Sequence, residues 1–415
     1  MMFPSRRRAL LRSAAMAVSM SSLAVLTACS GSGGDPAEGT GDCAAPGVTK
    51  TEVKAGMLWA DTGPGAYGLR AFRGGVDARL GVANAEGGVH GRKVVYAWRD
   101  DASNPALNLS GARELVQGEN VFAIMQGPGG ASGGAQYLAE QGVPVVGMAS
   151  DPVWADHDNM ISWFYFTTKS GSSTVWGDFI RSQGGSRAAT VNIALNAANQ
   201  DFSRQLAASL EAAGVEIALN FDVTADITSF DSLARQMKEA NIDTLTGALV
   251  PEVLAALLPA ARAAGVDLKV VLVPLGYDLT QLEQRGQAIA GTVIYTSFQP
   301  FELNYPAHQR LIDAMTRYVP QIDPPAQDSA VMGWLSADLL LRGLEAAGTC
   351  PTRQSFIDAL HAIHDYDGGG LLPEKVDLGK NRGVIANCFT FVRVSDDGSA
   401  FVPLQPPVRC GNPVS

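Results

Sequence analysis

The chain is short of the residues and motifs on which most metalloproteins and many enzymes depend. It has five scattered histidines, and its five cysteines form no Cys-x-x-Cys pair and no zinc-ligand spacing. It also lacks a Gly-x-Ser-x-Gly elbow, a His-Glu-x-x-His motif and a Walker phosphate loop. After residue 28 no apolar run is long enough to span a membrane as a helix. We therefore expect no metal, no cofactor and no catalytic site.

Positive charge is scarce as well. The 415 residues carry 31 lysines and arginines against 41 aspartates and glutamates, which gives a formal net charge of -10. An acidic surface argues against nucleic acid as a partner and against electrostatic adhesion to anionic lipid. What is present, 46% hydrophobic and 17% charged residues, is typical of a globular protein with a sizeable core.

The first 28 residues predict an export signal. A basic head with four arginines precedes an apolar stretch at residues 14–28 that is too short to span a membrane. The tetrapeptide Leu-Thr-Ala-Cys at 26–29 resembles the lipobox of bacterial lipoproteins, which implies cleavage before Cys29 and lipid attachment to its thiol. The alternative is an ordinary secretory signal with a chance cysteine. Residues 5–11 are similar to the twin-arginine export motif, although the general secretion pathway would accept the same basic head.

The segment that follows the signal differs in composition from the rest of the chain. Residues 29–42 are rich in glycine and serine with almost no apolar residues, so we expect a disordered tether. Removing the four arginines of the signal changes the formal charge from -10 to about -14, because the other ionisable residues are unaffected. About 370 residues remain from Cys43 onward, a length that suggests two lobes or domains.

Four cysteines lie beyond the lipobox, at Cys43, Cys350, Cys388 and Cys410. An even number in an exported protein indicates two disulfides, and three pairings are possible. We favour Cys43–Cys350 with Cys388–Cys410, because the second bond would tie the C-terminal tail to the strand pair before it.

Buried apolar strands alternate with amphipathic helices along the body of the chain. The first series has expected strands at 53–59, 93–98, 121–125 and 143–147, and helices at 69–86, 106–117 and 134–141. The second has strands at 189–195, 217–223, 244–249, 269–273 and 291–297, and helices at 202–213, 230–239 and 253–264. Helices at 305–318, 329–347 and 353–361 and a hairpin of strands at 388–394 and 401–404 close the chain. This rhythm predicts an α/β protein with two doubly wound parallel-sheet lobes.

Local motifs strengthen this interpretation. They are an apolar strand and an Asp-Thr-Gly-Pro-Gly-Ala-Tyr-Gly loop at 53–68, a Gly-Gly-Val-His-Gly turn at 87–91, a glycine-rich segment at 122–134 and Val-Pro-Val-Val-Gly at 143–147. In this order, residues 43–410 resemble the leucine/isoleucine/valine-binding family of extracytoplasmic solute receptors. These type I periplasmic binding proteins supply ATP-driven importers.

The resemblance also implies a domain organisation. The chain is expected to cross between the lobes near 166–170, 296–300 and 383–387, which makes a three-segment hinge. Lobe 1 would then comprise 43–167 and 298–385, and lobe 2 would comprise 168–297 and 386–410. The ligand cleft would lie between them, at the carboxyl ends of the strands.

In this family the glycine-rich loop grips a ligand carboxylate with a hydroxyl and with backbone amides at a helix N-terminus. Here the loop offers Gly129 and Gly130, with Ser132 as a substitute for the hydroxyl. The other ligand residues that the resemblance implies in this lobe are Tyr67, Met148 and Ser150. The same loop superficially satisfies a dinucleotide fingerprint, but its last glycine spacing is wrong and it is not in the first βαβ unit.

The second lobe departs further from the family pattern. Where amino-acid receptors commonly place a carboxylate for the ligand ammonium, the best-aligned residue is Leu275, and Tyr277 or Asp278 would have to replace it. Asn196 stands in the altered loop after the first strand of this lobe. Losing charged partners argues against an unmodified amino acid as the ligand, since a buried charge needs a partner.

Together these features predict a lipid-anchored, extracytoplasmic solute-binding subunit of an ABC-type importer. It would capture a small organic solute, a branched-chain or hydrophobic amino acid or a related compound, by hinged closure of two lobes. The expected partners are a permease and its ATPase subunits, and the expected form is a monomer on the bacterial cell membrane. The alternative is a ligand-sensing surface receptor that signals to a membrane partner.

Overall fold

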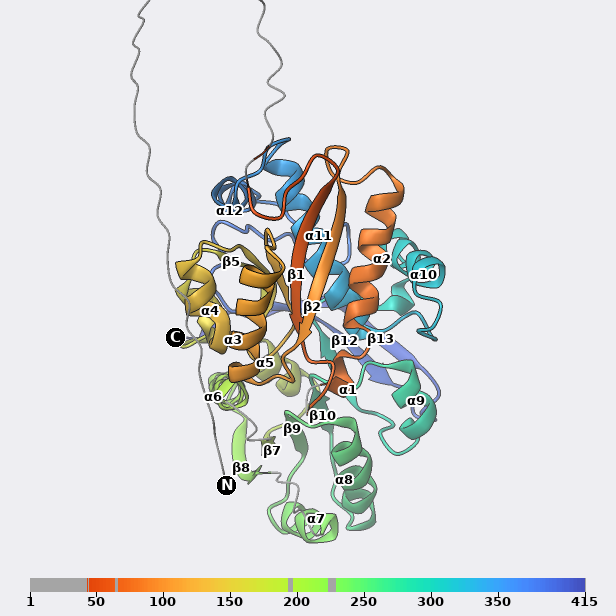
Figure 1. Cartoon of the computed structure of the whole chain (residues 1–415). Coiled ribbons are helices and arrows are strands. Elements are labelled where there is room, and N and C mark those ends of the chain that lie inside the picture. Colours follow the sequence, from red (N-terminus) through yellow and green to blue (C-terminus); the bar gives the residue numbers. More distant parts are fainter. Residues whose placement is uncertain (1–42, 44, 64–65, 193–196, 223–228, 415) are drawn as a thin grey trace, which may run out of the picture. The chain divides into compact units, whose positions relative to one another are not determined.

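The computed structural model of the protein describes residues 43, 45–63, 66–192, 197–222 and 229–414. Two sheets organise these residues (Figure 1). The predicted signal, tether and lipid-attachment residue Cys29 lie outside this part of the chain. None of the helices described is long and apolar enough to cross a membrane.

The first sheet has the strand order β2-β1-β3-β4-β5, and all four neighbouring pairs are parallel. Its strands are β1 (Glu52–Trp59), β2 (Lys93–Asp100), β3 (Ile124–Gln126), β4 (Val145–Ala149) and β5 (Met160–Tyr165). The connecting helices are α1 (Ala66–Leu69), α2 (Phe72–Ala85), α3 (Pro105–Arg113) with a π-helical extension at Glu114–Gly118, and α4 (Ala131–Glu140). A 3-10 helix at Pro152–Asp156 joins β4 to β5.

The second sheet has the order β13-β12-β11-β10-β9-β7-β8. Its parallel strands are β7 (Arg187–Asn192), β8 (Glu216–Asp222), β9 (Thr244–Gly247), β10 (Val270–Val273) and β11 (Val293–Thr296). The antiparallel hairpin β12 (Cys388–Val394) and β13 (Phe401–Cys410) extends it beyond β11. The helices of this series are α5 (Val175–Ser182), α6 (Ala197–Ala212), α7 (Phe230–Glu239), α8 (Pro251–Ala263) and α9 (Leu279–Arg285).

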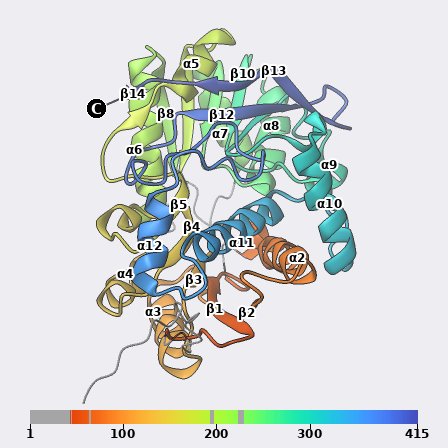
Figure 2. The same cartoon turned by 90° about the horizontal axis from the view of Figure 1, so that it is seen from above.

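The last three helices pack against strands of the first sheet or against its helix α2. They are α10 (Pro306–Tyr318), after a 3-10 turn at Phe301–Leu303, then α11 (Asp328–Ala346) and α12 (Arg353–His361). Both α10 and α11 pack against α2, and Figure 2 shows α11 beside it. A short pair, β6 (Ser172–Ser173) with β14 (Pro413–Val414), holds the C-terminal tail.

Glycines allow α2 and α11 to approach each other closely. A Cβ added to Gly75 would lie 1.9 Å from the carbonyl oxygen of Ala330, and one added to Gly333 would lie 1.8 Å from that of Phe72. Both distances are far shorter than a van der Waals contact, so only glycine fits at this crossing. The tight contact fixes α2, and with it the loop that precedes α2 at the end of β1.

Some expected elements differ from the structure. The pattern missed β5, α5 and α9, and α2 begins at Phe72 rather than at residue 69 because α1 is a separate turn. β13 continues to Cys410 instead of ending at residue 404. It contains Pro403, Pro406 and Pro407, which an edge strand tolerates but which hide a strand in the sequence.

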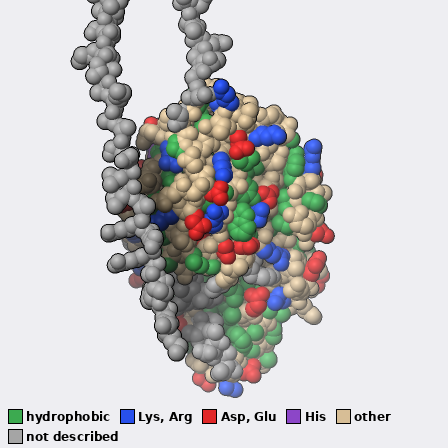
Figure 3. Space-filling model, in the orientation of Figure 1, with side chains coloured by type: hydrophobic (Ala, Val, Ile, Leu, Met, Phe, Trp, Pro, Cys, Tyr) green, Lys and Arg blue, Asp and Glu red, His purple; other side chains and the backbone are tan. Residues whose placement is uncertain are grey.

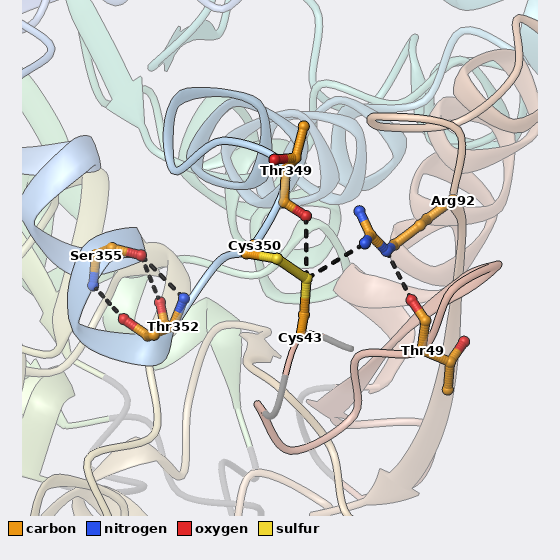
Figure 4. The surroundings of a disulfide bond; sticks show 7 residues. All are labelled: Cys43, Thr49, Arg92, Thr349, Cys350, Thr352 and Ser355. Atoms are coloured by element: carbon orange, nitrogen blue, oxygen red, sulfur yellow. Dashed lines mark hydrogen bonds between the residues drawn. A yellow bond between two sulfur atoms is a disulfide. The ribbon is translucent and has the colours of Figure 1, made fainter. Parts of the chain in front are cut away.

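Both predicted disulfides are present, which confirms the favoured pairing: Cys43 with Cys350, and Cys388 with Cys410. Cys388 and Cys410 stand opposite each other in the β12–β13 register. Around Cys43 (Figure 4), Arg92 Nε donates to the carbonyl oxygen of Thr49 at 2.6 Å, and Arg92 Nη2 lies 3.4 Å from the Cys43 sulfur. The disulfide between Cys43 and Cys350 thus joins the start of the described chain to the loop that follows α11.

Candidate ligand-binding site

The loop after β1 is held down by the end of the neighbouring strand. Asp100, the last residue of β2, accepts hydrogen bonds from the backbone N–H groups of Asp61 at 3.0 Å and Thr62 at 3.3 Å, and from the Thr62 hydroxyl at 2.5 Å. Burial alone would raise the pKa of Asp100, but these bonds and one from the Ala102 amide outweigh it and lower the pKa. An ionised Asp100 therefore fixes the start of this loop at the sheet edge.

A buried polar network supports the glycine-rich loop between β3 and α4. Asp101 is fully buried and accepts from Asn108 Nδ2 at 2.8 Å and from Gln126 Nε2 at 3.3 Å. Gln126 Nε2 also donates to the carbonyl oxygens of Gly127 and Gly129, at 2.9 and 3.3 Å. Because buried polar side chains cost free energy unless they are paired, this network specifies one conformation of the loop.

The loop itself brings four of the predicted residues together. Gly129 and Gly130 both have a positive φ, 88° and 74°, which glycine adopts without strain. The Gly129 amide donates to Ser150 Oγ at 2.9 Å, and the Ser132 amide donates to Asp151 Oδ2 at 3.1 Å. The residues therefore meet where β3 and β4 end and α4 begins.

The N-terminus of α4 has the character of an anion site. Its N-cap residue is Gly130, which has no side chain to cap the helix, and Asp151 and Asn108 accept from the Ser132 and Gly134 amides at 3.1 Å. The first amides of a helix lack partners inside the helix and carry its positive dipole end. Met148, which was also predicted, is buried in β4 beside this loop. The side chain of Tyr67 and the whole of Asn196 lie outside the described residues.

Tyr277, one of the two predicted replacements in the second series, already has partners. It is 4% exposed, its hydroxyl donates to Glu302 Oε2 at 2.6 Å, and it accepts from the Phe301 amide at 2.7 Å. Burial and the neighbouring Glu302 carboxylate raise its pKa well above the usual value. The geometry gives Tyr277 a packing role, so its predicted contact with a ligand gains no support here.

Asp278, the other replacement, pairs with an arginine that the sequence did not single out. It caps α9 by accepting from the Thr280 amide at 2.7 Å, and its Oδ2 accepts from Arg70 Nη2 at 2.8 Å. The same Arg70 nitrogen lies 2.9 Å from Thr280 Oγ1 and 3.2 Å from Gln327 Oε1. Arg70 follows α1, so this pair links the loop after β1 to the loop after β10.

A second carboxyl group lies close to this pair. Asp328 is the first residue of α11, and its buried Oδ1 has no hydrogen-bond partner within the described part of the chain. Burial and the negative charge of Asp278 raise the pKa of Asp328 to about 7. At neutral pH the carboxyl group of Asp328 is therefore about half protonated.

One group of potential metal ligands is found among the described residues. It consists of Glu374, Cys388 and Cys410, whose ligand atoms lie within 4.8 Å of one another. Both sulfurs are in a disulfide and cannot supply a thiolate, which a metal requires. The visible face in Figure 3 shows acidic and basic side chains interspersed rather than gathered into one patch.

Sequence reasoning did not assign roles to Arg70, Asp101 or Asn108. The sequence offers a weak indication of a role for Asp101, since an acidic pair at the end of an apolar strand is unusual. It offers no indication for Arg70, because its partner Asp278 is 208 residues away along the chain.

Known proteins resemble this chain in sequence and in fold. A curated relative, the Leu/Ile/Val-binding protein BraC3 of Rhizobium johnstonii, is 24% identical over 337 residues, covering 75% of this chain and 84% of its own length. Among solved structures, a solute-binding protein of Rhodopseudomonas palustris BisB5 in complex with 3,4-dihydroxybenzoic acid gives a TM-score of 0.71 at 18% identity, covering 87% of this chain and 98% of its own. The branched-chain amino acid binding protein of Streptococcus pneumoniae in complex with isoleucine gives 0.69 at 17% identity, covering 86% and 100%.

The family model described as periplasmic binding protein matches residues 52–399. This match spans the first sheet and all strands of the second except β13, and it confirms the family, the two-lobed type I fold and the expectation of a solute-binding protein rather than an enzyme. Membership also implies a location outside the cytoplasm. The chain therefore belongs to the periplasmic binding protein family.

Proposed function

We propose that this protein is the lipid-anchored solute-binding subunit of an ABC-type importer and that its ligand is a small organic carboxylate. Residues 1–28 would direct export, Cys29 would carry the lipid, and 29–42 would tether a monomeric body to the cell membrane. Lobe 1 would comprise 43–167 and 298–385, and lobe 2 would comprise 168–297 and 386–410. Two observations support this division: β5 and β7 belong to different sheets, and α10 and α11 pack on α2.

The N-terminus of α4, which carries the positive end of the helix dipole, is the observation that carries the proposal. The start of this helix, the Gly129–Gly130 turn and the Ser150 hydroxyl converge where parallel strands end, which is where open α/β sheets bind ligands. An anionic group is stabilised there by the helix dipole and by direct N–H donation. A carboxylate fits this arrangement, and the ligands of both structural relatives, isoleucine and 3,4-dihydroxybenzoic acid, contain one.

The contact between Arg70 and Asp278 favours a ligand that is an acid without an α-ammonium group. Asp278 is the carboxylate best placed to receive an ammonium, but Arg70 occupies it at 2.8 Å. An incoming ammonium would have to displace that guanidinium, and the displaced charge would then need a new partner. An aromatic or aliphatic monocarboxylate requires no such exchange.

A thermal-shift screen tests the role and the ligand class separately. The chain from residue 29, with Cys29→Ser to prevent lipidation, would be incubated with 1 mM isoleucine, its amine-free analogue 3-methylpentanoate, benzoate, 3,4-dihydroxybenzoate or benzyl alcohol. A ligand with a micromolar Kd should stabilise the native state by about 4 kcal/mol at this concentration. We expect shifts with the amine-free carboxylates and none with isoleucine or benzyl alcohol.

The outcomes distinguish the parts of the proposal. A shift with isoleucine but not with 3-methylpentanoate would refute the ligand class and keep the solute-binding role. A ligand that binds but does not stimulate the ATPase activity of the cognate permease in proteoliposomes would favour the sensing receptor. If none of these compounds or their homologues shifts the melting temperature, the carboxylate assignment at α4 is wrong.

A further inference from the structure

A cavity of about 250 Å³ lies away from the candidate ligand site, where the chain passes between its two sheets. Three lining residues stand on three separate passages: Tyr165 ends β5, Ser297 follows β11, and Asn387 directly precedes β12. No residue of the candidate ligand site lines this cavity. The cavity therefore belongs to a different part of the molecule and needs its own explanation.

The walls of the cavity are mostly apolar. Trp163, Phe164 and Tyr165 of β5 line it together with apolar residues of the segment before β12, among them Leu372, Val384 and Ile385. Val384 is 52% exposed, so an apolar side chain stands toward solvent in this lining. An apolar lining of this kind suits an apolar body.

The lysines and the aspartate of the lining each have a partner of opposite charge or a histidine partner. Lys380 Nζ lies 3.3 Å from Asp377 Oδ2, and Asp377 Oδ1 is 2.8 Å from His364 Nδ1. Lys375 Nζ lies 3.8 Å from Asp365 Oδ2. The two lysines and Asp377 are therefore engaged with partners from their own segment.

Glu374 is different. No ion pair or hydrogen bond of its carboxyl group is found within the described residues, and although the residue is exposed, desolvation by its neighbours raises the pKa of Glu374. Its carboxyl oxygen lies within 4.8 Å of both disulfide sulfurs, which cannot donate a hydrogen bond to it. Asn387 presents a second acceptor, a buried Oδ1 that has no donor in the part of the chain described. The cavity thus contains two acceptors without donors beside aromatic walls.

We propose that this cavity is a second ligand site, which binds a small organic cation with a primary ammonium group on an apolar body. The ammonium would donate to Glu374 and to Asn387 Oδ1, and the apolar body would pack against β5 and Val384. A bound cation stabilises an ionised carboxylate, so it would offset the desolvation that raises the pKa of Glu374. A neutral alcohol of the same shape could donate one hydrogen bond, but it would not neutralise the Glu374 charge or satisfy both acceptors.

Isothermal titration tests the site with benzylamine as the cation and benzyl alcohol as its neutral match, at pH 7.5 and low salt. We expect benzylamine to bind with one site per chain and benzyl alcohol to bind at least tenfold more weakly. Glu374→Gln should weaken benzylamine at least tenfold. Glu283→Gln, which removes an exposed glutamate of α9, should leave it unchanged.

A second variant guards against a folding artefact. Val384→Phe adds bulk at an exposed position in the lining and keeps Glu374, so it should also reduce benzylamine binding without lowering the melting temperature. Equal binding of benzylamine and benzyl alcohol, or benzylamine binding that survives Glu374→Gln in a folded protein, would overturn the proposal. Because the probe is a cation and the cleft is expected to hold an acid, this result is independent of the carboxylate screen.

Discussion

The carboxyl group of Asp328 makes the stability of this protein depend on pH in an unusual direction. An acid at the first position of a helix is normally favoured in its ionised form by the helix dipole. In α11, burial and the charge of Asp278 outweigh the dipole and raise the pKa of Asp328 from 3.8 to about 7. The folded state therefore binds a proton in a pH range where the unfolded chain has already released it.

The size of the effect follows from this difference in proton binding. Between pH 3.8 and 7 the folded state binds more protons than the unfolded state, so the free energy of unfolding falls by up to about 1.4 kcal/mol per pH unit and levels off above pH 7. From pH 5 to pH 8 this amounts to at most about 2.5 kcal/mol. Since Asp328 keeps some contact with solvent, a loss between about 1 and 2.5 kcal/mol is expected.

Asp328→Asn removes this titration and keeps the shape of the side chain. Urea unfolding at pH 5 and pH 8 would give the difference in the free energy of unfolding between the variant and the wild-type protein at each pH. This difference should favour the variant more at pH 8 than at pH 5, by about 1 to 2.5 kcal/mol. Asp313→Asn, at an exposed position of α10, serves as the matched control and should show the same difference at both pH values. A gain for Asp328→Asn that does not change with pH would show that this carboxyl ionises normally.

Three further predictions concern packing, the second disulfide and the glycine-rich loop. Gly333→Ala should destabilise the fold by at least about 2 kcal/mol, since its Cβ would overlap a backbone carbonyl of α2. Gly118→Ala, with open space around it, should not destabilise the fold. Thermal unfolding of the two variants measures this difference in stability. Replacing both Cys388 and Cys410 by serine should lower the free energy of unfolding by about 3 kcal/mol in urea titration, because a loop of 22 residues is no longer closed. Ser150→Ala should weaken the carboxylate found by the screen about tenfold in isothermal titration, since it removes the acceptor of the Gly129 amide.

Much of the fold could be predicted because strand and helix periodicity is local. The bounds of α7, α12 and β12 agree residue for residue with the expected ranges. For α12 the reason is visible: Thr352 and Ser355 form a reciprocal cap that marks the start of the helix in the sequence itself. By contrast, β13 was cut short because three prolines interrupt its pattern, and only its place at the sheet edge makes them acceptable.

The site was harder to foresee because its decisive contacts are tertiary. Gly129, Gly130 and Ser150 could be named because a loop motif carries them within about 20 residues. The Asp101–Asn108–Gln126 network beneath that loop depends on β2, α3 and β3 coming together, and no single motif encodes it. The partner of Asp278 depends on which loop of the other lobe faces it, and that is a property of the assembled fold.

The contact between Arg70 and Asp278 finally predicts how the lobes behave without a ligand. Arg70→Ala should shift the lobes toward an open arrangement, because this arginine joins the loop after β1 to the loop after β10 through Asp278 and Thr280. A partly exposed ion pair with accompanying hydrogen bonds contributes about 1 kcal/mol, which corresponds to roughly a fivefold change in the ratio of open to closed molecules. Small-angle scattering should therefore show a larger radius of gyration for the unliganded variant. Arg73→Ala, which removes contacts only within α2 and β2, is the matched control. If both variants scatter like the wild-type protein, the Arg70–Asp278 pair does not bias closure, and the reason given for excluding an ammonium ligand loses its force.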